Sequence, residues 1–251
     1  MHVSRKSFRI LKGRNCLATL LLFGAGLIQA APITFTDGTF TLSNYSITTI
    51  QSGGGSINVS QTLTGGDPGA AVQINTTVPA GQFLALEYLL NPSFVYNPGT
   101  QGAISSISFS QDVNFQSGIG VGVEAAFSLI SQGGNLYVDR INVPASAGVF
   151  EDASASGLQA SDYDLITNLN TLAENTTEHP NFSSGPLEFG FMGAWSNQAG
   201  SPAYSEVELL DNLSITVTAE TPEPATPLLL GAGLAGLGLI RRRTSRDSRV
   251  R

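Results

Sequence analysis

Residues 32–220 contain no lysine, no cysteine and a single arginine, Arg140. Eleven of the twelve basic residues lie in the first 14 or the last 11 positions, whereas 17 of the 19 acidic residues lie in this middle stretch. A strongly acidic surface repels phosphate backbones, which argues against nucleic acid as a partner. Without cysteine the middle of the chain has no disulfides, and its single histidine, His179, makes a zinc site improbable.

The first 30 residues are not expected to belong to the folded domain. A basic segment that ends at Arg14 precedes the apolar run "LATLLLFGAGLI" (17–28), and the small residues "QAA" follow it. This order is typical of a secretory signal peptide, and the apolar run is too short to span a bilayer comfortably. We therefore predict that residues 1–30 are a signal peptide, cleaved after Ala30 or Ala31, and that the protein is exported.

Residues 32–218 alternate between apolar and polar side chains, a pattern that places every second side chain on one face of a sheet. The clearest alternating runs lie at residues 107–115, 119–129, 187–191 and 213–217. The run "FLALEYLL" (83–90) is nearly continuous and predicts a strand covered on both faces. Because turn sequences such as "GGDPG", "NPG" and "GGN" separate the runs, we predict a single all-β domain, an antiparallel β-sandwich of the jelly-roll type.

One segment, "SDYDLITNLNTLAEN" (161–175), departs from this alternation. Ser161 and Asp164 have the spacing of a capping box at a helix N-terminus. The apolar residues that follow at helical spacing are Leu165, Ile166, Leu169 and Leu172. The segment therefore predicts one short helix between strands of the sandwich.

The C-terminal segment combines prolines, a short apolar run and a cluster of arginines. The apolar run (228–240) would form a helix about 20 Å long, shorter than the roughly 30 Å hydrocarbon core of a bilayer. Three arginines end the run, as expected for a segment whose C-terminal side stays cytoplasmic. We predict a proline-rich linker over residues 219–227, followed by a hydrophobic helix and an arginine-rich tail over residues 228–251.

The sequence "PEPAT" (222–226), followed by the apolar run and "RRR", resembles the PEP-CTERM sorting signal of Gram-negative bacteria. In that family an exosortase, a membrane-embedded cysteine transpeptidase, recognises the signal at the inner membrane and cleaves near the Pro-Glu-Pro motif. The resemblance implies that Pro222, Glu223 and Pro224 are recognised by this partner and are not catalytic here. It also implies a transient inner-membrane anchor and release to the cell surface or extracellular matrix, where such proteins accompany exopolysaccharide or biofilm production.

Two further fragments, "GGDPGAAVQI" (65–74) and "LLDNLSITVT" (209–218), are similar to strands of lectin-like and carbohydrate-binding jelly-roll domains. This resemblance implies the fold and favours sugars as ligands. Trp195 and Tyr204 lie in or after a Gly/Ser/Asn-rich segment, so each ring either stacks on a sugar or covers the core. Gly120, Gly122 and Glu124 share one strand face. The two glycines there permit close approach of a ligand or of another strand.

Groups for nucleophilic catalysis are scarce. His179 lies in the segment "EHPNF", no Gly-x-Ser-x-Gly elbow presents a serine, and we expect an exposed loop histidine. We expect the domain to have no catalytic residues, no cofactor and no enzymatic activity.

Three carboxylates in "EVELLD" (206–211) are the main exception. Glu206, Glu208 and Asp211 have a spacing similar to the Glu-x-Asp-x-x-Glu signature of some jelly-roll glycosidases, with the wrong acidic residue at two positions. The favoured interpretation is that Glu206 and Glu208 face solvent while Val207 and Leu209 pack inward.

Calcium would require several oxygen ligands on a bent loop. The candidate ligands are Asp67, Glu151, Asp152, Asp162 and Asp164. They follow no recognisable loop template, so we expect no metal site and interpret these residues as solvated, with structural calcium as the alternative.

These patterns favour an exported bacterial protein of the cell surface or matrix with a structural or adhesive role. Binding to exopolysaccharide is one version of this role. Two alternatives remain open: a glycosidase or lyase that acts on matrix polysaccharide, and a calcium-dependent adhesin. The residues that bind the ligand are not identified by the sequence.

Overall fold

The structure is a computed structural model that describes residues 31–81, 83–117, 123–142, 147–197 and 199–220. All of them belong to one compact unit, Ile28–Pro222. The predicted signal peptide (1–30), the predicted hydrophobic helix with its tail (228–251) and the motif residues Pro222, Glu223 and Pro224 lie outside the described residues. Within the described ranges, the helices are too short and too polar to cross a membrane.

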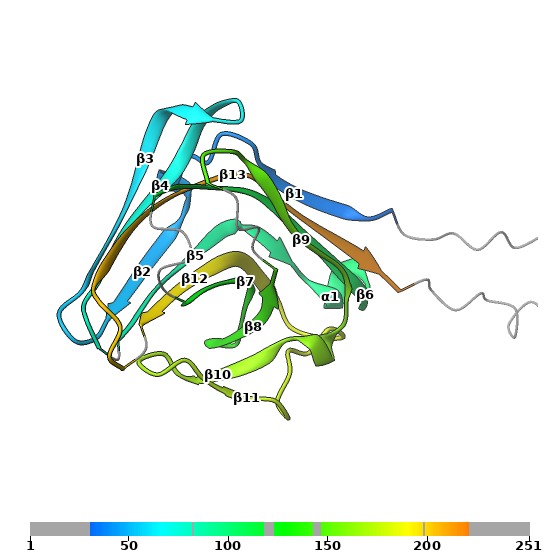
Figure 1. The fold of residues 1–251 in the computed structure, drawn as a ribbon. Helices are drawn as coiled ribbons and strands as arrows, with labels where there is room; N and C mark the ends of the chain where they lie inside the picture. The colour runs from blue at the N-terminus through cyan, green and yellow to red at the C-terminus, as the bar shows by residue number, and fades with distance from the viewer. Residues whose placement is uncertain (1–30, 82, 118–122, 143–146, 198, 221–251) are drawn as a thin grey trace, which may run out of the picture. The chain divides into compact units, whose positions relative to one another are not determined.

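Two antiparallel sheets face each other, which confirms the predicted all-β sandwich (Figure 1). The first sheet has the order β3-β4-β13-β6-β9, and β1 also pairs with β13. Its strands are β1 (Ile33–Asp37), β3 (Ser56–Gly66), β4 (Gly69–Val78), β6 (Ile104–Ser117), β9 (Glu151–Leu158) and β13 (Tyr204–Ala219).

The second sheet has the order β11-β10-β8-β7-β12-β5-β2. Its strands are β2 (Ser46–Gln51), β5 (Phe83–Tyr96), β7 (Val123–Gln132), β8 (Asn135–Ile141), β10 (Asp164–Asn168), β11 (Ala173–Asn175) and β12 (Leu187–Asn197). Helical turns are confined to η1 (Leu42–Asn44), α1 (Pro98–Gln101) and η2 (Ala160–Asp162) in the described part of the chain. In Figure 1 the second sheet curls, and β10 and β11 lie below the curve that β5, β12, β7 and β8 form.

The main hydrophobic core lies between the two sheets. Most of the predicted alternations are confirmed, because one parity of each strand enters this core. The residues concerned include Ile107, Phe109, Val113 and Phe115 of β6, Leu187, Phe189 and Phe191 of β12, and Leu213, Ile215 and Val217 of β13. Each fully buried side chain of this size contributes about 1.5–3 kcal/mol through the area it removes from water.

A second hydrophobic cluster covers the other face of the second sheet. On β5, Ala85 and Leu89 enter the main core while Leu86 and Leu90 enter the second cluster, so the predicted two-sided burial of this strand is confirmed. The alternating residues of β7, such as Phe127, also enter the second cluster rather than the core between the sheets.

The helix predicted over residues 161–175 is wrong. One turn of 3₁₀-helix, η2, occupies Ala160–Asp162, and the strands β10 and β11 follow. A capping contact is present two residues earlier than predicted, where Asp162 Oδ2 accepts a hydrogen bond from the backbone N–H of Gln159 at 2.7 Å.

Tertiary packing explains why this segment is extended. The adjacent residues Leu165 and Ile166 pack against the main core and the second cluster, which lie on opposite faces of the sheet. A strand places neighbouring side chains on opposite faces, whereas a helix places them about 100° apart. Asn168 then accepts a hydrogen bond from the backbone N–H of Asn170, in the turn that leads to β11.

The predicted turns lie between strands as expected. Gly133 and Gly134 join β7 to β8 with φ angles of 61° and 86°, values that favour glycine. The turn at Asp67-Pro68 joins β3 to β4.

Candidate functional site

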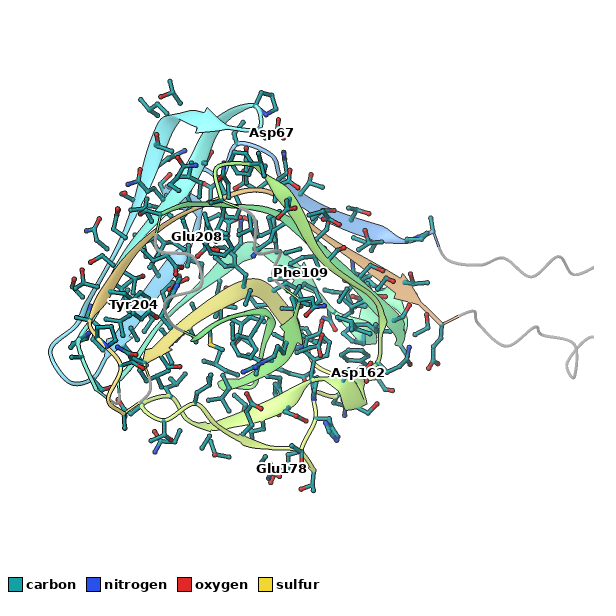
Figure 2. The ribbon with its side chains drawn as sticks, in the orientation of Figure 1. Asp67, Phe109, Asp162, Glu178, Tyr204 and Glu208 are labelled. Carbon is teal, nitrogen blue, oxygen red and sulfur yellow. The ribbon has the colours of Figure 1, made fainter. Side chains whose placement is uncertain are left out.

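The two carboxylates predicted to face solvent, Glu206 and Glu208, are buried between the sheets, so that prediction is wrong. Figure 2 labels Glu208 in this interior. Each side chain is only 4% exposed, and the inward face of β13 continues through Leu210. The cause is an irregularity in the pairing of β13 with β6 between Asp211 and Ser214. Even-numbered residues face inward before it, and odd-numbered residues face inward after it.

A third glutamate reaches the same interior from the second sheet. Glu87 lies on β5, is fully buried, and pairs with Gly193 of β12. A β-carbon at Gly193 would lie 2.5 Å from Glu87 Oε1 and 2.7 Å from the ring of Trp195. Position 193 therefore has space for the carboxyl group and the indole only because it is a glycine.

The indole of Trp195 connects the two sheets. Trp195 lies on β12, is 1% exposed, and donates a hydrogen bond from Nε1 to Glu206 Oε1 at 2.7 Å. The buried Tyr204 donates from its hydroxyl to the carbonyl of Ser196 at 3.2 Å. Both rings cover the core, so neither of the two predicted candidates for sugar stacking faces solvent.

The electrostatics of this interior are set by its low polarity and by like charges. Burial raises the pKa of Glu208 well above its usual range, and the nearby carboxyl groups of Glu87 and Glu206 raise it further. Thr76 lies opposite Glu206 on β4, and its buried hydroxyl has no hydrogen-bond partner among the described residues. The interior can hold protons, and its three glutamates are almost completely buried.

The outer face of the first sheet carries a different kind of site. A depression of about 270 Å³ lies over β13, β6 and β9, and its lining is rich in hydroxyl groups. The polar side chains that line it are Ser108, Ser110, Asp152, Ser154, Ser156, Ser214 and Thr216.

Strand register arranges these hydroxyl groups in rows. One row runs through Thr36, Ser214, Ser110 and Ser154 on four neighbouring strands. A second row runs through Thr34, Thr216 and Ser108, and the hydroxyl oxygens of Thr34 and Thr216 are 3.0 Å apart. Because neighbouring strands are about 4.8 Å apart, each row presents hydroxyl groups at a regular spacing.

The acidic residues considered as calcium ligands do not converge. Glu151 and Asp152 lie on β9 in the first sheet, whereas Asp162 and Asp164 lie at η2 and β10 beside the second. Within the described residues, no group of three or more His, Cys, Asp or Glu side chains is placed to hold a metal ion.

The remaining candidate calcium ligand, Asp67, belongs to a turn that is held by hydrogen bonds. Its backbone N–H donates to Asp211 Oδ2, and Asn212 Nδ2 donates to the Asp67 carbonyl and to Asp112 Oδ2. These contacts hold the β3–β4 turn against the irregular part of β13. Asp211 is fully buried there and lies on the opposite face of β13 from Glu208, because side chains three residues apart in a strand point to opposite faces.

His179 is half-buried rather than exposed. Its Nδ1 lies 2.9 Å from the carbonyl oxygen of Tyr163 and 3.8 Å from Asp164 Oδ1. These contacts hold the loop that contains the histidine against η2 and β10. The glycine-rich face at residues 120 and 122, and the side chain of Glu124, lie outside the described residues.

Two features of the site were not predicted, although the sequence contains a signal for each. Glu87 is a lone acidic residue in a strand expected to be covered on both faces, which implies a buried carboxyl group. The serines of "ISSISFSQ" (104–111) and "ASAS" (153–156) alternate with apolar or small residues, which implies a hydroxyl-bearing face.

Residues 220–243 match the family model of the PEP-CTERM protein-sorting motif. This match shows the predicted sorting signal, which indicates an exported protein that is transiently anchored in a membrane and processed by an exosortase. The match does not extend into the sandwich. No curated protein matches the chain in sequence.

Several solved jelly-roll domains are similar to the sandwich in structure. A family 11 carbohydrate-binding module from Clostridium thermocellum, in complex with a mixed-linked tetrasaccharide, has a TM-score of 0.46 and 9% identity over 76% of this chain and 98% of its own. The xylan-binding domain CBM22-1 of Paenibacillus barcinonensis Xyn10C has a TM-score of 0.37 and 13% identity over 77% and 96%. Arcelin-5, a lectin-like defense protein from Phaseolus vulgaris, has a TM-score of 0.39 and 10% identity over 75% and 99%.

Proposed function

We propose that this is a structural or adhesive protein of the bacterial cell surface or extracellular matrix, and that its sandwich binds an uncharged polysaccharide. The observation that carries the proposal is the hydroxyl-lined depression on the outer face of β13, β6 and β9. Serine and threonine hydroxyl groups both donate and accept hydrogen bonds, as the hydroxyl groups of a sugar do. Their short side chains let a polymer approach the sheet closely.

Charge favours a neutral polymer over an acidic one. Asp152 lies in the lining of the depression, and the single basic residue of the middle stretch, Arg140, lies elsewhere. Arg140 is positioned over the Phe127 ring, 5.4 Å from its centroid, on the outer side of the second sheet. An anionic polysaccharide would meet repulsion at this face without a compensating cation.

The geometry of Glu206 and Glu208 supports a role without catalysis. Glycosidases place two carboxyl groups on either side of the bond that they cleave. Here both groups are 4% exposed and face the opposite sheet, and one accepts a hydrogen bond from Trp195. We therefore favour binding over hydrolysis or elimination.

The proposed route to the surface follows the predicted segments. Residues 1–30 direct export, and residues 219–227 present Pro222, Glu223 and Pro224 to an exosortase in the inner membrane of a Gram-negative bacterium. The helix and arginine-rich tail at 228–251 hold the chain there until cleavage. The released domain, residues 32–218, then acts in the matrix.

The test compares binding of the exported protein with neutral and acidic polysaccharides by affinity electrophoresis. We expect retardation in at least one neutral polymer, and at least a tenfold loss of affinity in the double variant Ser110→Glu and Ser154→Glu, which places two charges in the depression. Ser46→Glu adds a charge to an exposed position on β2 of the other sheet and serves as the matched control. Unchanged binding by the double variant, or binding to acidic polymers alone, would contradict the proposal. Release of reducing ends or unsaturated products would favour the enzyme alternative.

A further inference from the structure

Three carboxyl groups from the two opposing sheets meet in the interior of the sandwich. Glu206 and Glu208 come from β13, and Glu87 comes from β5, with exposed fractions of 4%, 4% and 0%. These three residues are called the carboxyl cluster below. Carboxyl groups that share a buried site cannot all ionise without cations, because burial and mutual repulsion both disfavour the charged form.

The elements around the carboxyl cluster supply little compensating charge. The residues opposite its members in the strand register are Thr76 and Ile74 of β4, Phe115 of β6, Gly193 of β12 and Thr49 of β2. The Trp195 indole donates to Glu206, and Glu124 of β7 pairs with Trp195 along the backbone while its side chain lies outside the described set.

Basic groups lie elsewhere in the described part of the sandwich. Arg140 stacks on Phe127, which belongs to the cluster on the far face of the second sheet. His179 lies beside Tyr163 and Asp164. Neither side chain is placed to balance a negative charge between β13 and β5.

We propose that the carboxyl cluster is a pH-sensitive contact between the two sheets, which keeps at least one proton in the folded sandwich and weakens the fold when that proton is lost. The sandwich would then be most stable in acidic surroundings and would loosen between β13 and β5 as the pH rises.

The direction of the effect follows from proton linkage. Burial raises the pKa of Glu208 well above its usual range, and Glu87 and Glu206 raise it further. The unfolded chain has a glutamate pKa of about 4.3, so above that pH the folded state binds more protons than the unfolded state. The stabilisation is complete below the unfolded pKa and decreases as the pH rises toward the folded pKa. For each retained proton, the unfolding equilibrium constant increases about tenfold per pH unit in this range.

Other groups titrate in the same direction, so the wild-type pH profile alone does not test the proposal. Burial is the first cause of the raised pKa values of Asp139, Glu174 and Asp211. The test must compare variants that remove one proton site and keep its shape. Glu208→Gln does this in the carboxyl cluster, and Glu178→Gln does it at an exposed position (Figure 2).

The experiment is urea unfolding of the full chain in mild detergent at pH 5 and pH 8, followed by fluorescence. Trp195 is the single tryptophan of the chain and is buried beside the carboxyl cluster, so its emission reports on the sandwich alone. The measured quantity is the unfolding equilibrium constant at pH 8 divided by the unfolding equilibrium constant at pH 5. We expect a ratio at least tenfold smaller in Glu208→Gln than in the wild type, and an unchanged ratio in Glu178→Gln.

A second variant covers the case in which Glu208→Gln does not fold. Glu87→Gln acts from the opposite sheet, and the proposal predicts the same decrease in the ratio. Equal ratios in the wild type and in whichever variant folds would overturn the proposal, as would a wild type that becomes more stable from pH 5 to pH 8. If neither amide variant folds at either pH, the carboxyl groups are required as structural acceptors and the proposal is also rejected.

Discussion

The indole nitrogen of Trp195 donates a hydrogen bond to Glu206 Oε1 at 2.7 Å, across the interior between the two sheets. Trp195 belongs to β12 in the second sheet, and Glu206 belongs to β13 in the first. A buried carboxyl group that loses its donor keeps the cost of its desolvation. This one contact therefore couples the packing of the sandwich to the polar groups inside it.

We predict that Trp195→Phe destabilises the sandwich by about 1–3 kcal/mol, because the ring position is kept while the donor to Glu206 is lost. Urea unfolding followed by circular dichroism measures the change, since the variant has no tryptophan. A double-mutant cycle with Glu206→Gln separates the hydrogen bond from ring packing and should give a coupling energy of at least about 0.5 kcal/mol. Additive effects of the two substitutions would contradict the coupling.

Gly193→Ala should destabilise the fold by about 1–3 kcal/mol through overpacking. The added methyl group would lie 2.5 Å from Glu87 Oε1 and 2.7 Å from the Trp195 ring. Gly38→Ala is the matched control, because its methyl group would meet Asn212 at an ordinary 3.5 Å. Thermal unfolding of both variants measures the difference, and equal melting temperatures would show that the interior can adjust to a methyl group at position 193.

Alternating hydropathy was enough to predict the strands and the sandwich, because each strand buries one parity of its residues. The run 213–217 shows this, since its three apolar residues enter the main core. Alternation predicted the wrong direction for the side chains of Glu206 and Glu208, because the irregular pairing between Asp211 and Ser214 changes the inward parity of β13. Nothing in the residue types of this strand indicates that a glutamate faces inward and Val207 outward.

The other errors also come from contacts between segments far apart in the sequence. The segment 161–175 has helical spacing, yet its apolar residues pack against two clusters on opposite faces of a sheet. Trp195 lies among small polar residues that suggest a loop, but this segment is a strand between β5 and β7. The rows of hydroxyl groups depend on the register of four strands, which the sequence of any one strand does not determine.

Asp139 should make the sandwich more stable in acid. Burial, followed by the charges of Asp162 and Asp164, raises the pKa of Asp139 to about 6. The stabilisation from its retained proton is complete below the ordinary aspartate pKa of about 3.9 and is lost as the pH rises through 6. Relative to the wild type, Asp139→Asn should therefore gain stability between pH 4 and pH 7, as measured by urea unfolding at both values. Asp152→Asn, at an exposed position, is the control, and an equal gain in both variants would contradict the assignment to Asp139.

Chelation should leave the melting temperature of the protein unchanged to within about 1 °C. A metal bound to the folded state would stabilise it by mass action, so its removal would lower the melting temperature. The expectation follows from the acidic residues of β9 and of η2–β10, which lie beside different sheets rather than around one point. The measurement is thermal unfolding of the exported protein with and without excess EDTA, with added magnesium as a control for ionic strength. A decrease of several degrees that calcium restores would favour the calcium-dependent adhesin instead.

Loss of the sorting motif should prevent release of the protein from the membrane. Residues 220–243 match the PEP-CTERM motif. We propose that the exosortase recognises Pro222, Glu223 and Pro224. The double variant Glu223→Ala and Pro224→Ala should therefore remain uncleaved in the membrane fraction, because the apolar run and arginines still anchor the chain. Thr221→Ala, next to the motif, is the matched control and should be processed like the wild type. Gel mobility in membrane and culture fractions measures the outcome, and normal release of the double variant would show that cleavage depends on other residues.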